Sequence, residues 1–72
     1  MKETILAPIS GIINQIVSPT GSKVYINELI LRIEIMKLFY DVSSSLNGTI
    51  NLFVSEGEFV QEGQSLGEII GE

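Results

Sequence analysis

The sequence predicts an all-β domain built from two similar halves. Three observations support this prediction: an internal repeat, short apolar segments separated by turn-forming residues, and the absence of a helical period. The chain has 72 residues and is 44% hydrophobic, so we expect one small domain, residues 1–72, with a packed core. The expected fold is a two-fold pseudosymmetric β-sandwich, to which each half supplies about four short strands.

The repeat aligns residues 7–33 with residues 44–69. The matched positions are glycines, an Asn that also tolerates positive φ, and aliphatic residues of similar size. The pairs are Gly11 with Gly48, Gly21 with Gly57, Val24 with Val60, Asn27 with Gly63, and Ile30 with Leu66. Two copies are too few for a solenoid, so the halves must bury their apolar faces against each other.

The two copies differ by one residue, which predicts a β-bulge in the first. The offset between matched glycines falls from 37 to 36 along the repeat, so the first copy holds one extra residue. Residues 49–54 alternate as a regular strand should, whereas Asn14 and Gln15 together interrupt the alternation in the first copy. We therefore expect Asn14 and Gln15 to disturb the strand ladder and Asn51 to pair regularly.

The central stretch, residues 32–42, predicts a β-hairpin with Met36 and Lys37 as its two loop residues. In this register Arg32 lies opposite Asp41, and the aliphatic residues share the other face. A shift of one residue in either direction places charged side chains opposite apolar ones. Lys37 is therefore expected at the tip of a tight turn.

Met-Lys is an unfavourable loop for such a hairpin. Two-residue loops favour Asn-Gly or Gly-X because the backbone needs positive φ, and Met-Lys held this way would cost roughly 1–3 kcal/mol of local strain. One interpretation is an ordinary solvated lysine on a poorly optimised loop. The strained turn and the position of Lys37 between the two repeats favour a functional lysine instead.

The string EIMKLF, from Glu34 to Phe39, resembles the attachment motif of biotinyl domains, whose typical core is Ala-Met-Lys-Met. Similar stretches flank it, namely APISG, GSKVYINELILRIE and GEFVQEGQSLGEI, so the resemblance covers nearly the whole chain. The chain is identified as a member of the biotinyl/lipoyl attachment domain family, most similar to the biotin carboxyl carrier domain of acetyl-CoA carboxylase and related biotin-dependent carboxylases. The resemblance implies a flattened barrel of two four-stranded antiparallel sheets.

The resemblance also implies a function. Lys37 would carry biotin through an amide bond, with Ile35, Met36 and Leu38 as flanking recognition residues. Partial packing on the end of the barrel is an equal alternative for Met36 and Leu38, and strand pairing is the expected role of Asp41. Once a biotin protein ligase has attached the biotin, such carriers act as a swinging arm between biotin carboxylase and carboxyltransferase. Carboxylases and decarboxylases share this type of carrier, and here we expect an acyl-CoA carboxylase of fatty acid biosynthesis.

The composition agrees with a carrier that has no catalysis of its own. The chain has no Cys and no His, so neither a metal site nor acid–base chemistry is expected. Nine acidic residues against four basic ones give a net charge of −5, the wrong sign for a nucleic-acid or anionic-membrane partner. No signal-peptide or transmembrane pattern is present, so we expect a cytoplasmic protein.

Two alternatives stay open. A lipoyl carrier has the same fold but typically places an acidic residue directly before the lysine, where this chain has Met36. An unmodified module for protein contacts is favoured if Ile35, in place of the usual small residue, blocks the ligase. Leu38 replaces the second Met of the motif, and Ser44 and Ser45 replace a frequent Ala-Pro. Without a thumb-like insertion or an Ala/Pro-rich linker, we expect either a free-standing thumbless carrier or a domain of a longer protein.

Overall fold

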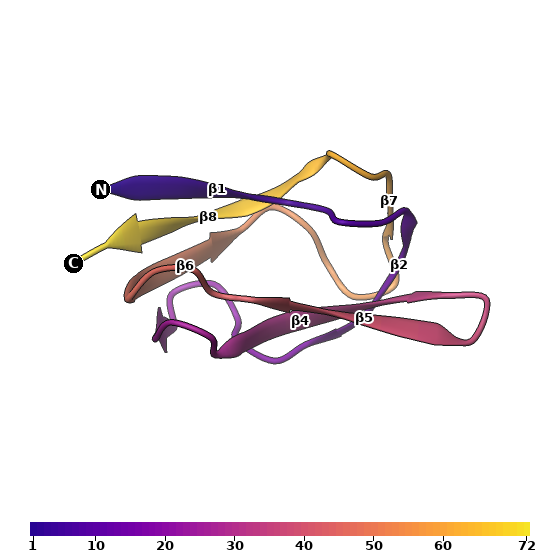
Figure 1. Cartoon of the computed structure of the whole chain (residues 1–72), viewed down its shortest axis with the longest axis horizontal. Coiled ribbons are helices and arrows are strands. Elements are labelled where there is room, and N and C mark those ends of the chain that lie inside the picture. Colours follow the sequence, from indigo (N-terminus) through magenta and orange to yellow (C-terminus); the bar gives the residue numbers. More distant parts are fainter.

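The computed structural model describes residues 1–72 as eight strands without a helix. The strands are β1 (Lys2–Leu6), β2 (Gly11–Ile16), β3 (Lys23–Val24), β4 (Leu29–Ile35), β5 (Leu38–Ser43), β6 (Gly48–Leu52), β7 (Phe59–Val60) and β8 (Ser65–Gly71). They form two four-stranded antiparallel sheets, in the orders β1-β8-β6-β3 and β5-β4-β2-β7 (Figure 1). The predicted barrel-sandwich of two four-stranded sheets is confirmed. The structure holds no helix of the length and hydrophobicity that crossing a membrane requires.

The two halves of the chain are related by a pseudo-two-fold axis that exchanges the sheets. Strands β1 to β4 match β5 to β8 in order, and each sheet takes two strands from each half. The connecting turns repeat as well. The Gly21 N–H donates to the carbonyl of Ile50, and the Gly57 N–H donates to that of Ile13, each at 2.8 Å. Both glycines have positive φ, 92° and 88°, as the matched turns require.

The core lies between the two sheets and is entirely aliphatic. The repeat-matched pairs Val24 with Val60 and Ile30 with Leu66 are all fully buried, as a shared core position should be. The 13 buried hydrophobic residues are Ile5, Ala7, Ile13, Val24, Ile30, Leu31, Ile33, Val42, Ile50, Val54, Val60, Leu66 and Ile69. Such burial is the main stabilising contribution in a domain of this size.

The predicted bulge is confirmed and falls on one residue. Ile13 pairs with Ile33 and Gln15 pairs with Arg32, so Asn14 has no partner on β4. In the matching strand β6, pairing with β8 continues without a shift through Asn51. Asn14 is therefore the extra residue of the first copy, the one that changes the offset between matched positions from 37 to 36.

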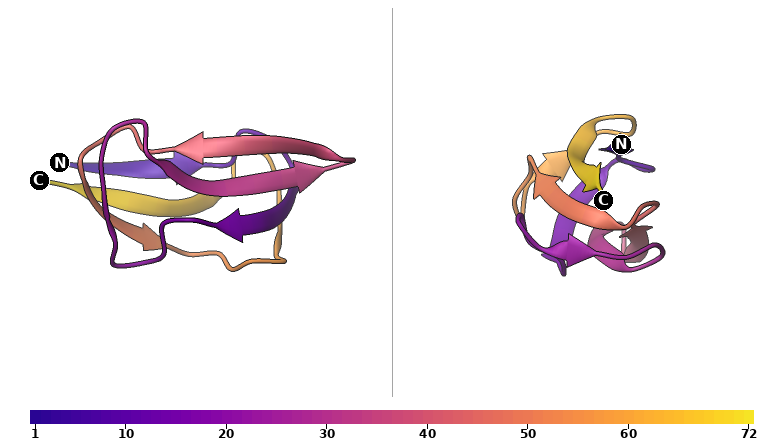
Figure 2. Two further views of the ribbon diagram at one scale, coloured as in Figure 1. Left: turned by 90° about the horizontal axis from the view of Figure 1, so that it is seen from below. Right: turned by 90° about the vertical axis from the view of Figure 1, so that its left-hand side faces the viewer.

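The hairpin of β4 and β5 projects from one end of the molecule, and both termini lie at the other (Figure 2). The molecule is elongated, with extents of 36 × 18 × 17 Å. Close approach of β2 to β4 near the hairpin tip requires a glycine, because a Cβ on Gly11 would lie 2.6 Å from the carbonyl oxygen of Glu34. The fold thus presents a single hairpin tip away from the chain ends.

Candidate functional site

Lys37 lies at the tip of the projecting hairpin, as the register predicted. Ile35 pairs with Leu38 and Arg32 pairs with Asp41, which leaves Met36 and Lys37 as the loop. Their φ angles are 51° and 68°, so both central residues occupy the left-handed region, the combination typical of a type I′ turn. The tip therefore holds its lysine in a conformation that Met and Lys rarely adopt.

The hairpin is anchored at its base and free at its tip. Leu31 and Ile33 of β4 are fully buried in the core, which positions the strand that leads to the loop. Beyond them the side chains become exposed, and 89% of Met36 and 67% of Leu38 are accessible to solvent. Neither residue is among the side chains packed against the core, which disfavours the packing alternative for Met36 and Leu38. Ile35, by contrast, is half-buried.

The other charged side chains of the hairpin make polar contacts below the tip. The Arg32 Nε lies 2.8 Å from Asp41 Oδ1, and the guanidinium lies 5.9 Å from the centre of the Phe39 ring. The Nδ2 of Asn14 donates to Glu34 Oε1 at 3.2 Å. The expected strand-pairing role of Asp41 is confirmed, and the bulge residue Asn14 supports Glu34.

Lys37 is the one basic side chain of the molecule that makes no ion pair. The other three of the four Lys and Arg residues are paired, Lys2 with Glu68, Lys23 with Glu72, and Arg32 with Asp41. Sequence reasoning missed this contrast, because the partners of Lys2 and Lys23 become neighbours only through the pairing of distant strands. An exposed amine without a competing carboxylate is accessible to another protein.

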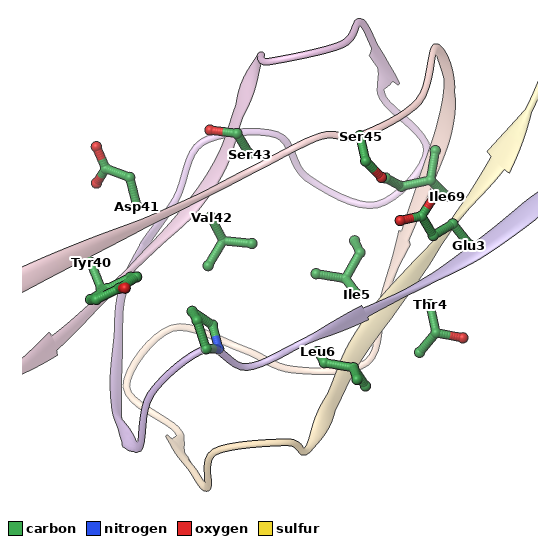
Figure 3. Close-up of a pocket in the computed structure, with 11 residues that line it drawn as sticks. Glu3, Thr4, Ile5, Leu6, Tyr40, Asp41, Val42, Ser43, Ser45 and Ile69 are labelled. Atoms are coloured by element: carbon green, nitrogen blue, oxygen red, sulfur yellow. The ribbon is translucent and has the colours of Figure 1, made fainter.

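A groove of about 310 Å³ runs between β1 and β5, each of which is an edge strand of its sheet. Ile5 and Val42 point into it from the two strands (Figure 3). Tyr40 lines the end toward the hairpin, but Lys37 does not line the groove. No three acidic side chains converge as a metal-ion site would require. The exposed tip is therefore the feature with the clearest chemistry, a free amine.

The family described as "Biotin-requiring enzyme" matches residues 20–69, well over half of the chain and including the whole hairpin. The chain belongs to this family. It is thus a biotin/lipoyl attachment domain. The family that the hairpin motif predicted is confirmed. No curated protein matches the chain.

Several solved structures have the same fold as the chain. The Kluyveromyces lactis urea carboxylase matches 97% of the chain with a TM-score of 0.88 and 21% identity. A single-chain, multi-domain long-chain acyl-CoA carboxylase matches 99% with a TM-score of 0.90 and 17% identity. The lipoyl domain of the 2-oxoglutarate dehydrogenase complex from Azotobacter vinelandii matches 96% with a TM-score of 0.81 and 28% identity.

The relative sizes of these proteins differ widely. The chain spans 6% and 7% of the lengths of the two carboxylases, but it covers 98% of the lipoyl domain. The matched region is therefore a small part of each carboxylase and nearly the whole of the lipoyl domain.

Proposed function

We propose that the chain is a biotin carboxyl carrier domain in which Lys37 is the attachment residue. The observation that carries the proposal is the geometry of Lys37: an unpaired, exposed amine on a positive-φ hairpin tip, in a chain whose other basic side chains are all paired. The family match supports a covalent cofactor of the biotin or lipoyl type. Met36 before the lysine, where lipoyl domains typically have an acidic residue, favours biotin.

The chain's own contribution is presentation of the amine. A biotin protein ligase would take a proton from the Lys37 ammonium, and the Nζ would attack the activated carboxyl carbon of biotin, forming an amide as the activating group leaves. Bound biotin would supply the ureido nitrogen that accepts and releases a carboxyl group. The anchored strands β4 and β5 keep the tip projecting, so the tethered group would reach partner sites at high effective concentration.

The residues next to the lysine would serve recognition. Met36 and Leu38 are exposed on either side of Lys37 and present apolar surface to an approaching enzyme. Ile35 is half-buried and directly precedes the loop, so its bulk would restrict how the ligase binds the tip. The expected partners are a biotin protein ligase, a biotin carboxylase and a carboxyltransferase. The last two would be domains or subunits of an acyl-CoA carboxylase and would catalyse the carboxylation reactions.

Co-expression with a biotin protein ligase and excess biotin tests the proposal. The intact mass should increase by one biotinyl group, and peptide mapping should place it on Lys37. Lys37→Arg keeps the charge but cannot form the amide, so it should fold and stay unmodified. Lys23→Arg is the matched control, because Lys23 is also exposed but is paired with Glu72, and it should be modified like the parent chain.

The alternatives predict different masses. A lipoyl group added to Lys37 by a lipoate ligase, with no reaction by the biotin ligase, would establish the lipoyl carrier. A folded chain that neither ligase modifies, while Ile35→Ala is modified, would mean that Ile35 blocks attachment and that the natural chain is an interaction module. Under our proposal Ile35→Ala leaves modification intact or speeds it.

A further inference from the structure

A row of outward-facing side chains, three of them exposed, crosses the outer face of the sheet β5-β4-β2-β7 beside the hairpin tip. Backbone pairing places Phe39 opposite Glu34, Glu34 opposite Ile12, and Ile12 opposite Phe59. The exposed fractions are 56% for Phe39, 41% for Ile12 and 55% for Phe59. We call Phe39, Glu34, Ile12 and Phe59 the aromatic row. It spans all four strands, about 14 Å at the usual spacing between strands.

The pseudo-two-fold axis supplies an internal comparison for this row. The matched positions on the other sheet are Lys2, Ile70, Thr49 and Lys23, again paired in one line across four strands. We call these the mirror row. The fold therefore accepts lysines at both ends of such a row and has no structural need for phenylalanines there. Exposed aromatic side chains that folding does not require are typical of contact surfaces between proteins.

The aromatic row lies next to the candidate attachment residue. Only one strand pair, Ile35 with Leu38, separates the Glu34–Phe39 pair from the loop that holds Lys37. Exposed Met36 lies in that loop, whereas Leu38 faces the opposite side of the hairpin from Phe39. A protein that covers the row therefore also reaches the Lys37 amine.

Charge indicates what kind of surface the row accepts. Glu34 lies at its centre and Glu58 directly precedes Phe59, in a chain with a net charge of −5. The one basic group beside the row, Arg32 over the Phe39 ring, is neutralised by its ion pair with Asp41, so the surface stays acidic. A second copy would bring equal charges together at the centre of the contact, which disfavours self-association. A partner that presents apolar surface around a basic side chain is complementary.

We propose that the aromatic row is the docking surface for the ligase that modifies Lys37; this inference rests on the proposed function. A ligase must select the chain before any cofactor is attached, so its selectivity can come only from protein surface. Enzymes that act later have the attached group to bind as well. The row distinguishes Lys37 from Lys2 and Lys23, which lie in the mirror row without aromatic neighbours on their strand pairs.

Steady-state biotinylation tests this, with purified biotin protein ligase, ATP and biotin, and with the unmodified chain as the varied substrate. The double variant Ile12→Thr/Phe59→Lys copies Thr49 and Lys23 of the mirror row and leaves the hairpin residues untouched. Loss of the docking contact should raise KM by about tenfold or more and leave kcat unchanged. Peptide mapping confirms that Lys37 remains the modified residue.

The reciprocal double variant, Thr49→Ile/Lys23→Phe, is the matched control on the other sheet. It alters exposed hydrophobicity to a similar extent and should leave KM unchanged. Circular dichroism and the melting temperature establish that each variant is folded. The milder Phe59→Leu, which keeps an apolar side chain, should raise KM by less than the double variant and covers the case in which the double variant unfolds.

Each outcome separates the two levels of inference. A parent chain that the ligase does not modify refutes the proposed function itself. A parent chain that is modified, with the same KM for the folded row variants, overturns the docking proposal alone. Row variants that alter self-association in sedimentation, or that affect only a later carboxylase step, also overturn it, because the occupant would then be a second copy or a different enzyme.

Discussion

Strain at the hairpin tip should be measurable as lost stability. Met36 has a φ of 51°, in a region that costs roughly 1–2 kcal/mol for residues other than Gly, Asn and Asp. Asn is tolerated there because its short polar side chain can hydrogen-bond locally. Met36 is 89% exposed, so its replacement removes little buried surface. We expect Met36→Asn to raise the free energy of unfolding by about 1 kcal/mol.

The same molecule provides the reverse experiment. Asn27, in the turn between β3 and β4, has a φ of 72° and is exposed. Its backbone N–H donates to the carbonyl of Ser44 at 2.7 Å, a bond that a side-chain substitution leaves in place. Asn27→Met puts methionine into the conformation that Met36 already has. It should therefore lower the free energy of unfolding by about the amount that Met36→Asn gains.

Thermal and urea unfolding measure both effects. For a domain of this size, 1 kcal/mol corresponds to a shift of about 4–8 °C in Tm. Met36→Asn should also slow the modification of Lys37, because it removes an apolar side chain beside the amine. A slower reaction in a more stable variant would mean that the strain at the tip lowers stability but serves recognition. A lower Tm for Met36→Asn, or a higher one for Asn27→Met, would refute the assignment of strain to these φ angles.

Further substitutions test other parts of the fold. Gly11→Ala should lose about 1–3 kcal/mol of stability in urea unfolding, because its Cβ would meet a backbone carbonyl of β4 at 2.6 Å; an unchanged midpoint would contradict this close packing. Exchange of Arg32 and Asp41 should change stability by under about 1 kcal/mol, since the pair is exposed. A larger loss would show that the arginine is needed on β4, for example for its contact with the Phe39 ring. A hydrogen bond to Glu72 raises the pKa of Lys23 above its ordinary value of 10.5. The stabilisation from this pair is therefore present below that pH and lost as the pH rises further, so the Tm difference from Lys23→Gln should shrink above pH 10.5 and stay constant between pH 7 and 9.

Sequence reasoning located the hairpin because its alternation of charged and apolar residues allows one register. It located the Asn14 bulge because the extra residue occurs in one copy only. Two other register shifts escaped it, between Ile5 and Leu6 and between Leu29 and Leu31. They are the same irregularity in the two halves, so the offset between the copies does not change and a comparison of the copies cannot detect it.

The aromatic row could not be predicted for a different reason. Phe39, Ile12 and Phe59 come from three segments far apart in the chain, and they align only because β2 lies between β4 and β7. The alternation within each strand indicates that these side chains face outward, but it does not indicate which strands are neighbours. Position in the sheet, and with it the contrast to the mirror row, is information that the topology adds.

Deletion of Asn14 tests whether the bulge is needed for the fold. Without this residue Gln15 would directly follow Ile13, and the pairs Ile13 with Ile33 and Gln15 with Arg32 would continue as a regular ladder, as in β6. The loss is one exposed hydrogen bond to Glu34, so we expect a decrease of at most about 1.5 kcal/mol in unfolding free energy.

The matched deletion removes Asn51 from β6, where no bulge can absorb the change. Asn51 pairs with Glu68, and its loss turns Leu52 and the residues after it to the opposite face until the next loop. We expect this deletion to abolish cooperative unfolding in urea, whereas the Asn14 deletion keeps both the transition and its m-value. Ile12 precedes the bulge and still pairs with Glu34, so the Asn14 deletion should also leave the modification of Lys37 unchanged. Equal damage from the two deletions would mean that the extra residue shapes the hairpin, and that it is not merely an insertion tolerated in one of two equivalent strands.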